Sequence, residues 1–236
     1  MLAKRMIVQY NEPMVLVIVF CEMLAFDGMF GPFKVGEATL TSEGPSVFRG
    51  ESVFVITSTE KTKGLFSYFY RVDDKYISYA RVADLIPLRF SKHIEEGKFK
   101  KELTVDYYND SIIYSNYRRY DTDKRYRDIL SALYYIRRLD FEVGDTLRIP
   151  IHTGGKPNIM EVPIVDTLEI SVPAGRFKTY VLKPIVKGEK IFGEEGGLFI
   201  YLSDDDEKLP IMIKSKLFFG SINFLLKEIK GERGRL

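Results

Sequence analysis

The sequence predicts a mainly β protein: a curved antiparallel β-roll or half-barrel wrapped around a single amphipathic helix. Three observations support this prediction. The chain has fifteen Tyr and seventeen Phe but no Trp, and aromatic residues suit a pleated, half-buried surface. Segments with apolar residues at every second position recur from Cys21 onward, separated by turn residues. One segment, RDILSALYYIRRLDFEVGD, changes to a helical period.

The first twenty residues allow two interpretations. Lys4 and Arg5 precede an apolar run at residues 14–20, as in a secretory signal, but small residues are missing before Cys21. Seven apolar residues are too few to span a bilayer, which takes about twenty. We expect residues 1–20 to be either a degenerate signal-like segment or a first buried strand.

The stretch GPFKVGEATLT changes face halfway along a strand. Phe33 and Val35 share one parity, whereas Ala38 and Leu40 share the other. A β-bulge at Gly36 would account for the change, and bulges are the usual means of bending a strand. The sequence therefore predicts a sheet that curls near Gly36.

Later segments continue the strand pattern. Apolar residues alternate with polar ones over residues 103–108 and 146–152, which predicts strands with one wet face. A longer alternation over residues 160–172 would span about 43 Å if straight, which is long for one strand. We therefore expect a bend near Asp166.

Turn residues divide the second half into hairpins. Pro173, Ala174 and Gly175 suit a tight turn, and Gly220 separates two further strand patterns. The acidic run at residues 204–207 lacks the spacing of a calcium loop, so we expect a solvated hairpin tip.

Residues 128–139 predict the main helix. Ile129, Leu133 and Ile136 recur at helical spacing, Asp128 can cap the start, and Arg137 lies near the negative end of the helix dipole. The apolar face of this helix must be covered, and the concave side of a curled sheet is the available cover.

A second segment, GLFSYFYRV, is the candidate ligand site. Leu65, Phe66, Phe69 and Tyr70 can share one helical face, although a buried loop is an equal alternative. Such a segment could plug the open end of a half-barrel and touch an apolar ligand. The alternative is that Phe66 and Phe69 are fixed anchors of the core.

Charge and cysteine content exclude several classes of site. Thirty-five Lys and Arg face thirty-three Asp and Glu, and the signs are mixed along the chain, so a nucleic-acid footprint is absent. One cysteine, Cys21, allows no internal disulfide and no thiolate metal cage. We expect neither a metal nor a cofactor.

No catalytic constellation stands out, so we expect no enzyme. His93 lies among charged residues and His152 lies on the outward parity of its strand, which favours surface or hydrogen-bonding roles. The adjacent carboxylates Glu95 and Glu96 would face opposite ways on a strand and could not share acid and base work.

Several blocks, in order, resemble the bacterial family called domain of unknown function 3108, over residues 22–229. The blocks are GPFKVGEATL, GLFSYFYRVDDKYISY, LIPLRFSKHIEEGKFKKELTVDYY, LSALYYIRRLDFEVGDTLRIPIHTGGK, VPAGRFKTYVLKPIVKGEKIF and DDDEKLPIMIKSKLFFGSINFLL. The resemblance implies an exported, periplasmic or envelope-associated β-roll or half-barrel, and it implies no established catalytic residues. Members usually begin with a cleaner secretory signal than this sequence has.

These observations lead to one domain organisation and two functional hypotheses. We expect a single antiparallel β domain at residues 21–230 and a frayed basic tail at 231–236. The first hypothesis is a binding or carrier module for an apolar or lipid-like ligand. The alternative is a structural or protein-interaction component of the cell envelope without a small-molecule ligand. Neither involves nucleic acid or a transmembrane span, and the oligomeric state is not set by the sequence.

Overall fold

A single large sheet organises the chain. The computed structural model describes residues 6–7, 18–122, 124–186, 197–217 and 220–235. The strands are β1 (Met6–Ile7), β2 (Ile18–Phe30), β3 (Phe33–Phe48), β4 (Glu51–Thr62), β5 (Asp73–Arg81), β6 (Pro87–Glu96), β7 (Phe99–Tyr107), β8 (Ser111–Tyr114), β9 (Arg119–Asp121), β10 (Thr146–Ile151), β11 (Asn158–Val172), β12 (Gly175–Leu182), β13 (Ile185–Val186), β14 (Leu198–Ser203), β15 (Pro210–Leu217) and β16 (Gly220–Arg235). The helices are α1 (Phe66–Phe69) and α2 (Ile129–Ile136).

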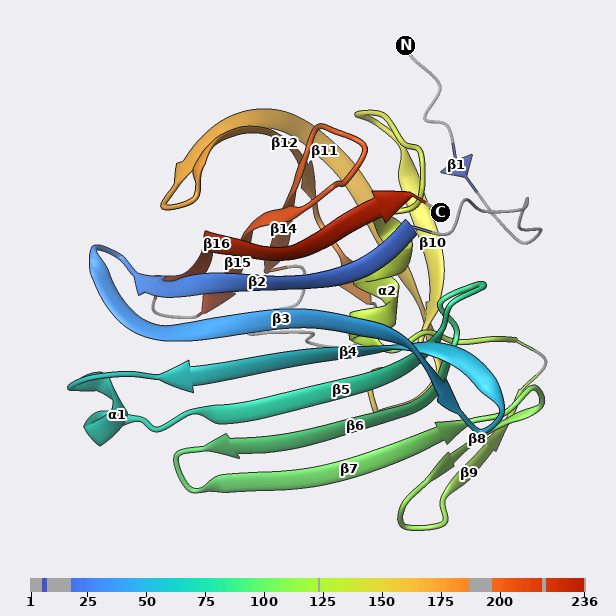
Figure 1. Ribbon diagram of the computed structural model, residues 1–236. Helices are drawn as coiled ribbons and strands as arrows, with labels where there is room; N and C mark the ends of the chain where they lie inside the picture. Colours follow the sequence, from blue (N-terminus) through green and yellow to red (C-terminus); the bar gives the residue numbers. More distant parts are fainter. Residues whose placement is uncertain (1–5, 8–17, 123, 187–196, 218–219, 236) are drawn as a thin grey trace.

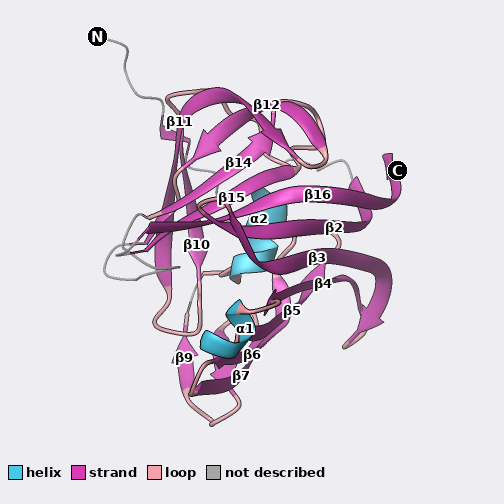
Figure 2. Ribbon diagram, turned by 90° about the vertical axis from the view of Figure 1, so that its left-hand side faces the viewer, coloured by secondary structure: helices cyan, strands magenta, loops and turns pink. Residues whose placement is uncertain are grey.

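The sheet is antiparallel except where β1 pairs with β10. Its strand order is β1-β10-β11-β12-β14-β15-β16-β2-β3-β4-β5-β6-β7-β8-β9, with β13 beside β11. The sheet is open and strongly curved, and α2 lies within the curl (Figures 1 and 2). The mainly antiparallel β prediction is thus confirmed.

Two bulges bend the sheet where the sequence predicts them. Gly28 pairs with Gly36 but Met29 pairs with Lys34, so Val35 is the extra residue of a bulge in β3. In β11 the register shifts between Ile164 and Asp166.

The bend in β11 lets one strand serve two parts of the sheet. Its first half pairs with β10 and its second half pairs with β12. Beside the bulge in β3, Gly36 lies very close to β4. A Cβ on Gly36 would lie 2.5 Å from the Lys61 carbonyl oxygen. Only glycine therefore permits this approach of β3 to β4.

The cap of the main helix is as predicted, but its surroundings differ. Asp128 Oδ1 accepts hydrogen bonds from the backbone N–H groups of Leu130 and Ser131 at 2.8 and 2.9 Å, and Ser78 Oγ donates to Oδ2 at 2.6 Å. Six of the eight residues of α2 are buried. The prediction of one amphipathic helix is therefore not met in that form: α2 is enclosed on most sides, and α1 is a second helix.

A buried ion pair attaches the end of α2 to the sheet. Arg137 and Glu22 are both buried, and Arg137 donates to both carboxylate oxygens of Glu22 on β2. Arg137 Nε also donates to the Glu207 carbonyl, 3.2 Å away in the β14–β15 connection. A paired and hydrogen-bonded charge can remain buried.

The ends of the chain differ from the expectation or lie partly outside the described residues. The sequence predicts a frayed tail at 231–236, but β16 continues to Arg235 and pairs with β2. Close packing explains this, because a Cβ on Gly231 would lie 2.0 Å from the Cys21 carbonyl oxygen. Of the apolar run at 14–20, residues 18–20 begin β2, and residues 14–17 lie outside the described part.

Candidate functional site

A half-enclosed apolar cavity of about 120 Å³ lies between α2 and the inner face of the sheet. Residues on β2, β3, β4, β5, α2, β14, β15 and β16 line it: Phe26, Ala38, Thr39, Leu40, Ser58, Glu60, Tyr76, Ile129, Leu130, Leu133, Leu198, Ile200, Ile213, Ser215 and Phe224. Its volume is close to the roughly 150 Å³ of an engineered cavity that binds benzene. It can therefore hold a small ring or a short alkyl segment, but not a whole lipid.

The cavity follows from strand parity and from the shortness of α2. Alternate residues of β3, β4 and β5 face inward, and α2 covers only part of the inner face (Figure 2). Ile129 and Leu133, two residues of the predicted apolar stripe, line the cavity and are only partly buried. The prediction that they close tightly on the sheet is therefore met only in part.

One side of the cavity is polar. Burial raises the pKa of Glu60 to about 7, and the charges of Asp74 and Glu96 add to the rise. Within the described part of the chain, the Glu60 carboxyl has no hydrogen-bond or ion-pair partner. Ser215 Oγ, on the cavity wall, is also buried without a hydrogen bond to any described residue. A bound group could satisfy both.

Three carboxyl groups from three strands gather beside the cavity. Burial raises the pKa of Asp74 and of Glu96, and a hydrogen bond joins the two side chains. The charge of Asp74 contributes to the raised pKa of Glu96, because two neighbouring carboxylates repel each other when both are ionised. The hydroxyl of Tyr76 lies near Asp74, and that of Tyr70 lies near Glu96, and these carboxyl groups help to raise the pKa of each tyrosine.

Sequence reasoning missed this group because its members are far apart along the chain. Glu60 is the direct cross-strand partner of Asp74, and Glu96 forms an isolated bridge with Val72, the residue before β5. The prediction that adjacent acidic residues face opposite ways holds: Glu95 pairs with Lys100, whereas Glu96 joins Asp74. The available signal was acidic residues at inward parities of successive strands.

The predicted site segment lies at the end of the sheet, outside the cavity wall. Leu65 precedes α1, whose four residues are all unburied, and Tyr70 ends it. Phe66 is 39 % exposed and Phe69 is 87 % exposed, so the alternative of fixed core anchors is wrong. Figure 2 shows α1 in front of the open end of the curl, with α2 visible inside. Of the four residues, Tyr70 is the one that lies against Glu96, a member of the cluster of carboxyl groups beside the cavity.

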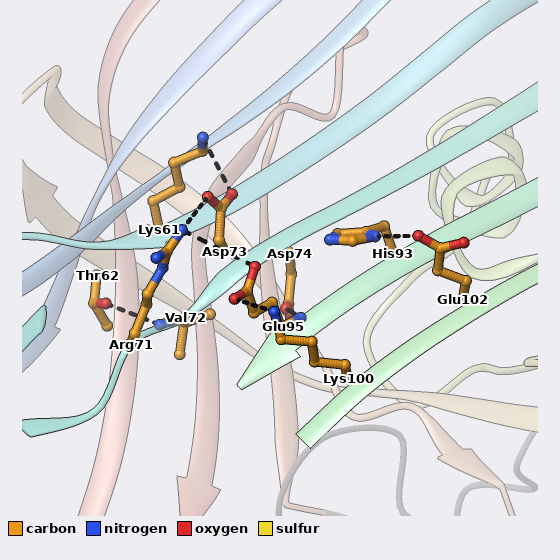
Figure 3. A network of polar contacts seen from close by, with 10 residues as sticks. All are labelled: Lys61, Thr62, Arg71, Val72, Asp73, Asp74, His93, Glu95, Lys100 and Glu102. Carbon is orange, nitrogen blue, oxygen red and sulfur yellow. Dashed lines mark hydrogen bonds and ion pairs between the residues drawn. The ribbon is translucent and has the colours of Figure 1, made fainter. Parts of the chain in front are cut away.

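A network of charged residues fixes the base of α1 (Figure 3). Lys61 pairs with Asp73 at 3.1 Å, which joins the end of β4 to the start of β5. Val72 N donates to Thr62 Oγ1 at 2.9 Å. The Tyr70 ring packs over Gly97, where a Cβ would lie 3.2 Å from the ring. These contacts hold the connection that presents α1.

The two histidines have different surroundings. His93 is exposed and contacts Glu102 at 3.1 Å, as expected (Figure 3). His152, expected on the outward face, lies just past the end of β10 and is instead fully buried, because Tyr107 and Tyr114 from β7 and β8 contact its ring.

Two tyrosines satisfy His152. The Tyr107 hydroxyl lies 2.9 Å from Nδ1, and the Tyr114 hydroxyl contacts Nε2 while donating to the Gly155 carbonyl. Burial lowers the pKa of His152 to about 4. A neutral, hydrogen-bonded histidine of this kind is part of the core and a poor general base at neutral pH.

Within the described part of the chain, no group of three or more His, Cys, Asp or Glu residues is arranged to hold a metal ion. No described helix is long and apolar enough to cross a membrane.

A family model and a solved structure match the chain. No curated protein matches it. Among solved structures it is similar to a β-barrel-like protein of domain of unknown function DUF1849 from Brucella abortus, with a TM-score of 0.61 and 8 % identity. The similarity covers 93 % of this chain and 100 % of that one, and at this identity it concerns the fold alone.

The family assignment rests on the sequence. The profile of the family described as protein of unknown function (DUF3108) matches residues 25–227, which is most of the chain and includes the cavity-lining strands β3 to β5. The chain is therefore a member of the DUF3108 family.

Proposed function

We propose that this chain is a non-catalytic binding module that takes an apolar group of a lipid-like ligand into the cavity beside α2. The observation that carries the proposal is the combination of an apolar wall with two polar groups at the same cavity: the half-buried Glu60 carboxyl and Ser215 Oγ, which is buried without a hydrogen bond to any described residue. Binding sites for small molecules have this composition, with a few polar groups that fix orientation.

The cavity volume restricts the ligand. About 120 Å³ accommodates a ring or the end of an alkyl chain, so the rest of a lipid-like ligand would extend past Glu60 toward the open end of the curl. The sheet wrapped around α2 would act as a rigid holder. The polar part of the ligand would meet Glu60 and Tyr76.

The cluster of three carboxyl groups beside the cavity supports a binding function better than a catalytic one. Asp74 accepts a hydrogen bond from the backbone N–H of Glu95 at 2.9 Å and lies against Glu96, so both carboxyl groups are engaged in structural contacts. An exported or cell-envelope location is part of this proposal, and its support is the family resemblance. The alternative, an interaction component without a ligand, is favoured by the exposed side chains of α1.

The test is saturable binding of a fluorescent fatty acid by the purified full-length chain, with native mass spectrometry for a co-purifying apolar molecule. Ala38→Leu puts extra volume into the cavity and should abolish uptake. Ala25→Leu, on the outer face of neighbouring β2, should leave uptake unchanged and serves as the control. No co-purifying molecule together with no saturable uptake would contradict the proposal.

A further inference from the structure

Several large aromatic and apolar side chains are exposed at the end of the sheet that carries α1. We define the α1 rim as Phe33, Leu65, Phe66, Tyr68, Phe69, Tyr70 and Phe99, all of which are exposed. They lie in or beside the β2–β3, β4–β5 and β6–β7 connections, which meet at one end of the sheet (Figure 1). Large exposed apolar patches mark interaction surfaces.

The rim is rich in basic residues. Residues 33–37, 61–73 and 95–101 contain seven Lys or Arg and four Asp or Glu. In two of the rim ion pairs the basic side chain is the more exposed partner: Lys100 is 69 % exposed against 18 % for Glu95, and Lys61 is 51 % exposed against 34 % for Asp73. In a third pair, Lys34 and Glu37 are equally exposed. Glu96 faces inward, where burial raises its pKa.

We propose that the α1 rim docks onto a lipid bilayer that carries anionic headgroups. Phe and Leu side chains would enter the acyl region, and the hydroxyl of Tyr68 would remain at headgroup depth, as amphipathic aromatic residues do at membrane surfaces. Lys63 and Lys98 flank them and would face the phosphates.

The shape of the rim favours a bilayer over a folded protein. α1 protrudes from a hairpin connection and buries none of its residues. A protruding apolar turn needs a matching pocket in a protein partner, whereas fluid acyl chains adapt to any shape. The charge complementarity with anionic lipid is the second reason.

The absence of tryptophan from the chain allows a direct test. Phe69→Trp places a single indole on the rim, and Tyr117→Trp places one on the β8–β9 turn. Tyr117 is a matched control: it is 91 % exposed and is followed by Arg118 and Arg119. The β8–β9 hairpin that carries it lies on the opposite side of the molecule from α1 (Figure 1). Both variants replace an aromatic ring by another, so the fold is retained.

With vesicles of phosphatidylcholine and phosphatidylglycerol, the indole emission of the Phe69→Trp variant should shift to the blue and be quenched by lipids brominated on their acyl chains. The emission of the Tyr117→Trp variant should do neither. With phosphatidylcholine alone, both responses should be weak. An equal response of the two reporters, or an equal response to the two kinds of vesicle, would overturn the proposal.

Co-sedimentation of the full-length chain gives the second measurement. The Tyr68→Ser/Phe69→Ser variant should bind anionic vesicles about tenfold or more weakly than wild type, because two rings no longer leave water. The Lys63→Gln/Lys98→Gln variant should lose about tenfold at low salt. Tyr117→Ser should bind like wild type. A wild-type chain that binds neither kind of vesicle would overturn the proposal and favour a protein partner for the rim.

Discussion

At the scale of single residues, Glu60 links the cavity to pH. Its pKa is raised from an ordinary 4.5 to about 7, so the folded chain holds this proton more tightly than the unfolded chain does. The stabilisation is complete below pH 4.5 and is lost as the pH rises through 7. The loss is at most about 3 kcal/mol.

Glu60→Gln should therefore flatten the fall in unfolding free energy between pH 4.5 and 7, measured by urea titration at several pH values. Part of the slope should remain, because Asp74 and Glu96 also have a raised pKa. Glu102→Gln, an exposed carboxylate on β7, is the control and should keep the wild-type slope. If unfolding free energy falls with pH as steeply in Glu60→Gln as in wild type, the pKa of Glu60 is not raised in the folded chain.

His152 makes the folded chain less stable as the pH falls, whereas Glu60 makes it less stable as the pH rises. Its pKa is lowered from 6.5 to about 4, so its stabilisation is complete above pH 6.5 and is lost as the pH falls through 4. His152→Gln should remove this acid-side loss, although it should be less stable at pH 7 because Tyr107 and Tyr114 lose their partner. His93→Gln, at the surface, is the comparison. The hypothesis fails if His152→Gln leaves the slope between pH 6.5 and 4 unchanged.

At the scale of elements, the lack of a side chain at Gly36 lets β3 approach β4 closely. Gly36→Ala should lower the unfolding free energy by about 1–3 kcal/mol, because the new methyl group would meet the Lys61 carbonyl at 2.5 Å. Gly28, its cross-strand partner, has 3.3 Å of clearance, so Gly28→Ala should cost less. Equal melting temperatures for Gly36→Ala and wild type would show that the strands can separate without loss.

The elements were largely predictable because their signals are local. Gly36 changes the parity of one strand, Asp166 interrupts one alternation, and Asp128 precedes one helical period, so each can be read within about a dozen residues. Their outcomes match the structure.

The candidate site was less predictable because it depends on which strands are neighbours and on their register. Glu60 and Asp74 meet only through the register of β4 with β5. The exposure of Phe69 also depends on position, since an apolar turn that ends beyond the sheet has nothing to pack against. The apolar side chain of Phe69 favours burial, but Phe69 is exposed because the neighbouring strands end before they could cover it.

At the scale of the whole molecule, the buried pair of Arg137 and Glu22 joins α2 to the sheet. Arg137→Met alone should lower the unfolding free energy by about 3–5 kcal/mol, because it leaves the Glu22 carboxylate buried without a counter-charge. The double variant Glu22→Leu/Arg137→Met should be more stable than Arg137→Met, since no charge is then left unpaired.

An exposed pair provides the control for this double-variant experiment. Glu169 and Arg176 form an ion pair on the surface between β11 and β12, and Glu169→Gln should change the unfolding free energy by less than about 1 kcal/mol. If Arg137→Met proves as mild as Glu169→Gln in urea denaturation, the buried pair does not hold α2 in place.

The pairing of β16 with β2 also affects the timing of folding. Phe30 on β2 pairs with Ile222 on β16, almost two hundred residues later in the chain. During synthesis on the ribosome, β2 would remain unpaired with β16 until most of the protein had been made. Pairing across so long a stretch of chain is also slow. Until then β2 would have a free edge, ready to join another strand. The seam between β2 and β16 is therefore the place where a nascent chain of this protein most needs protection from aggregation.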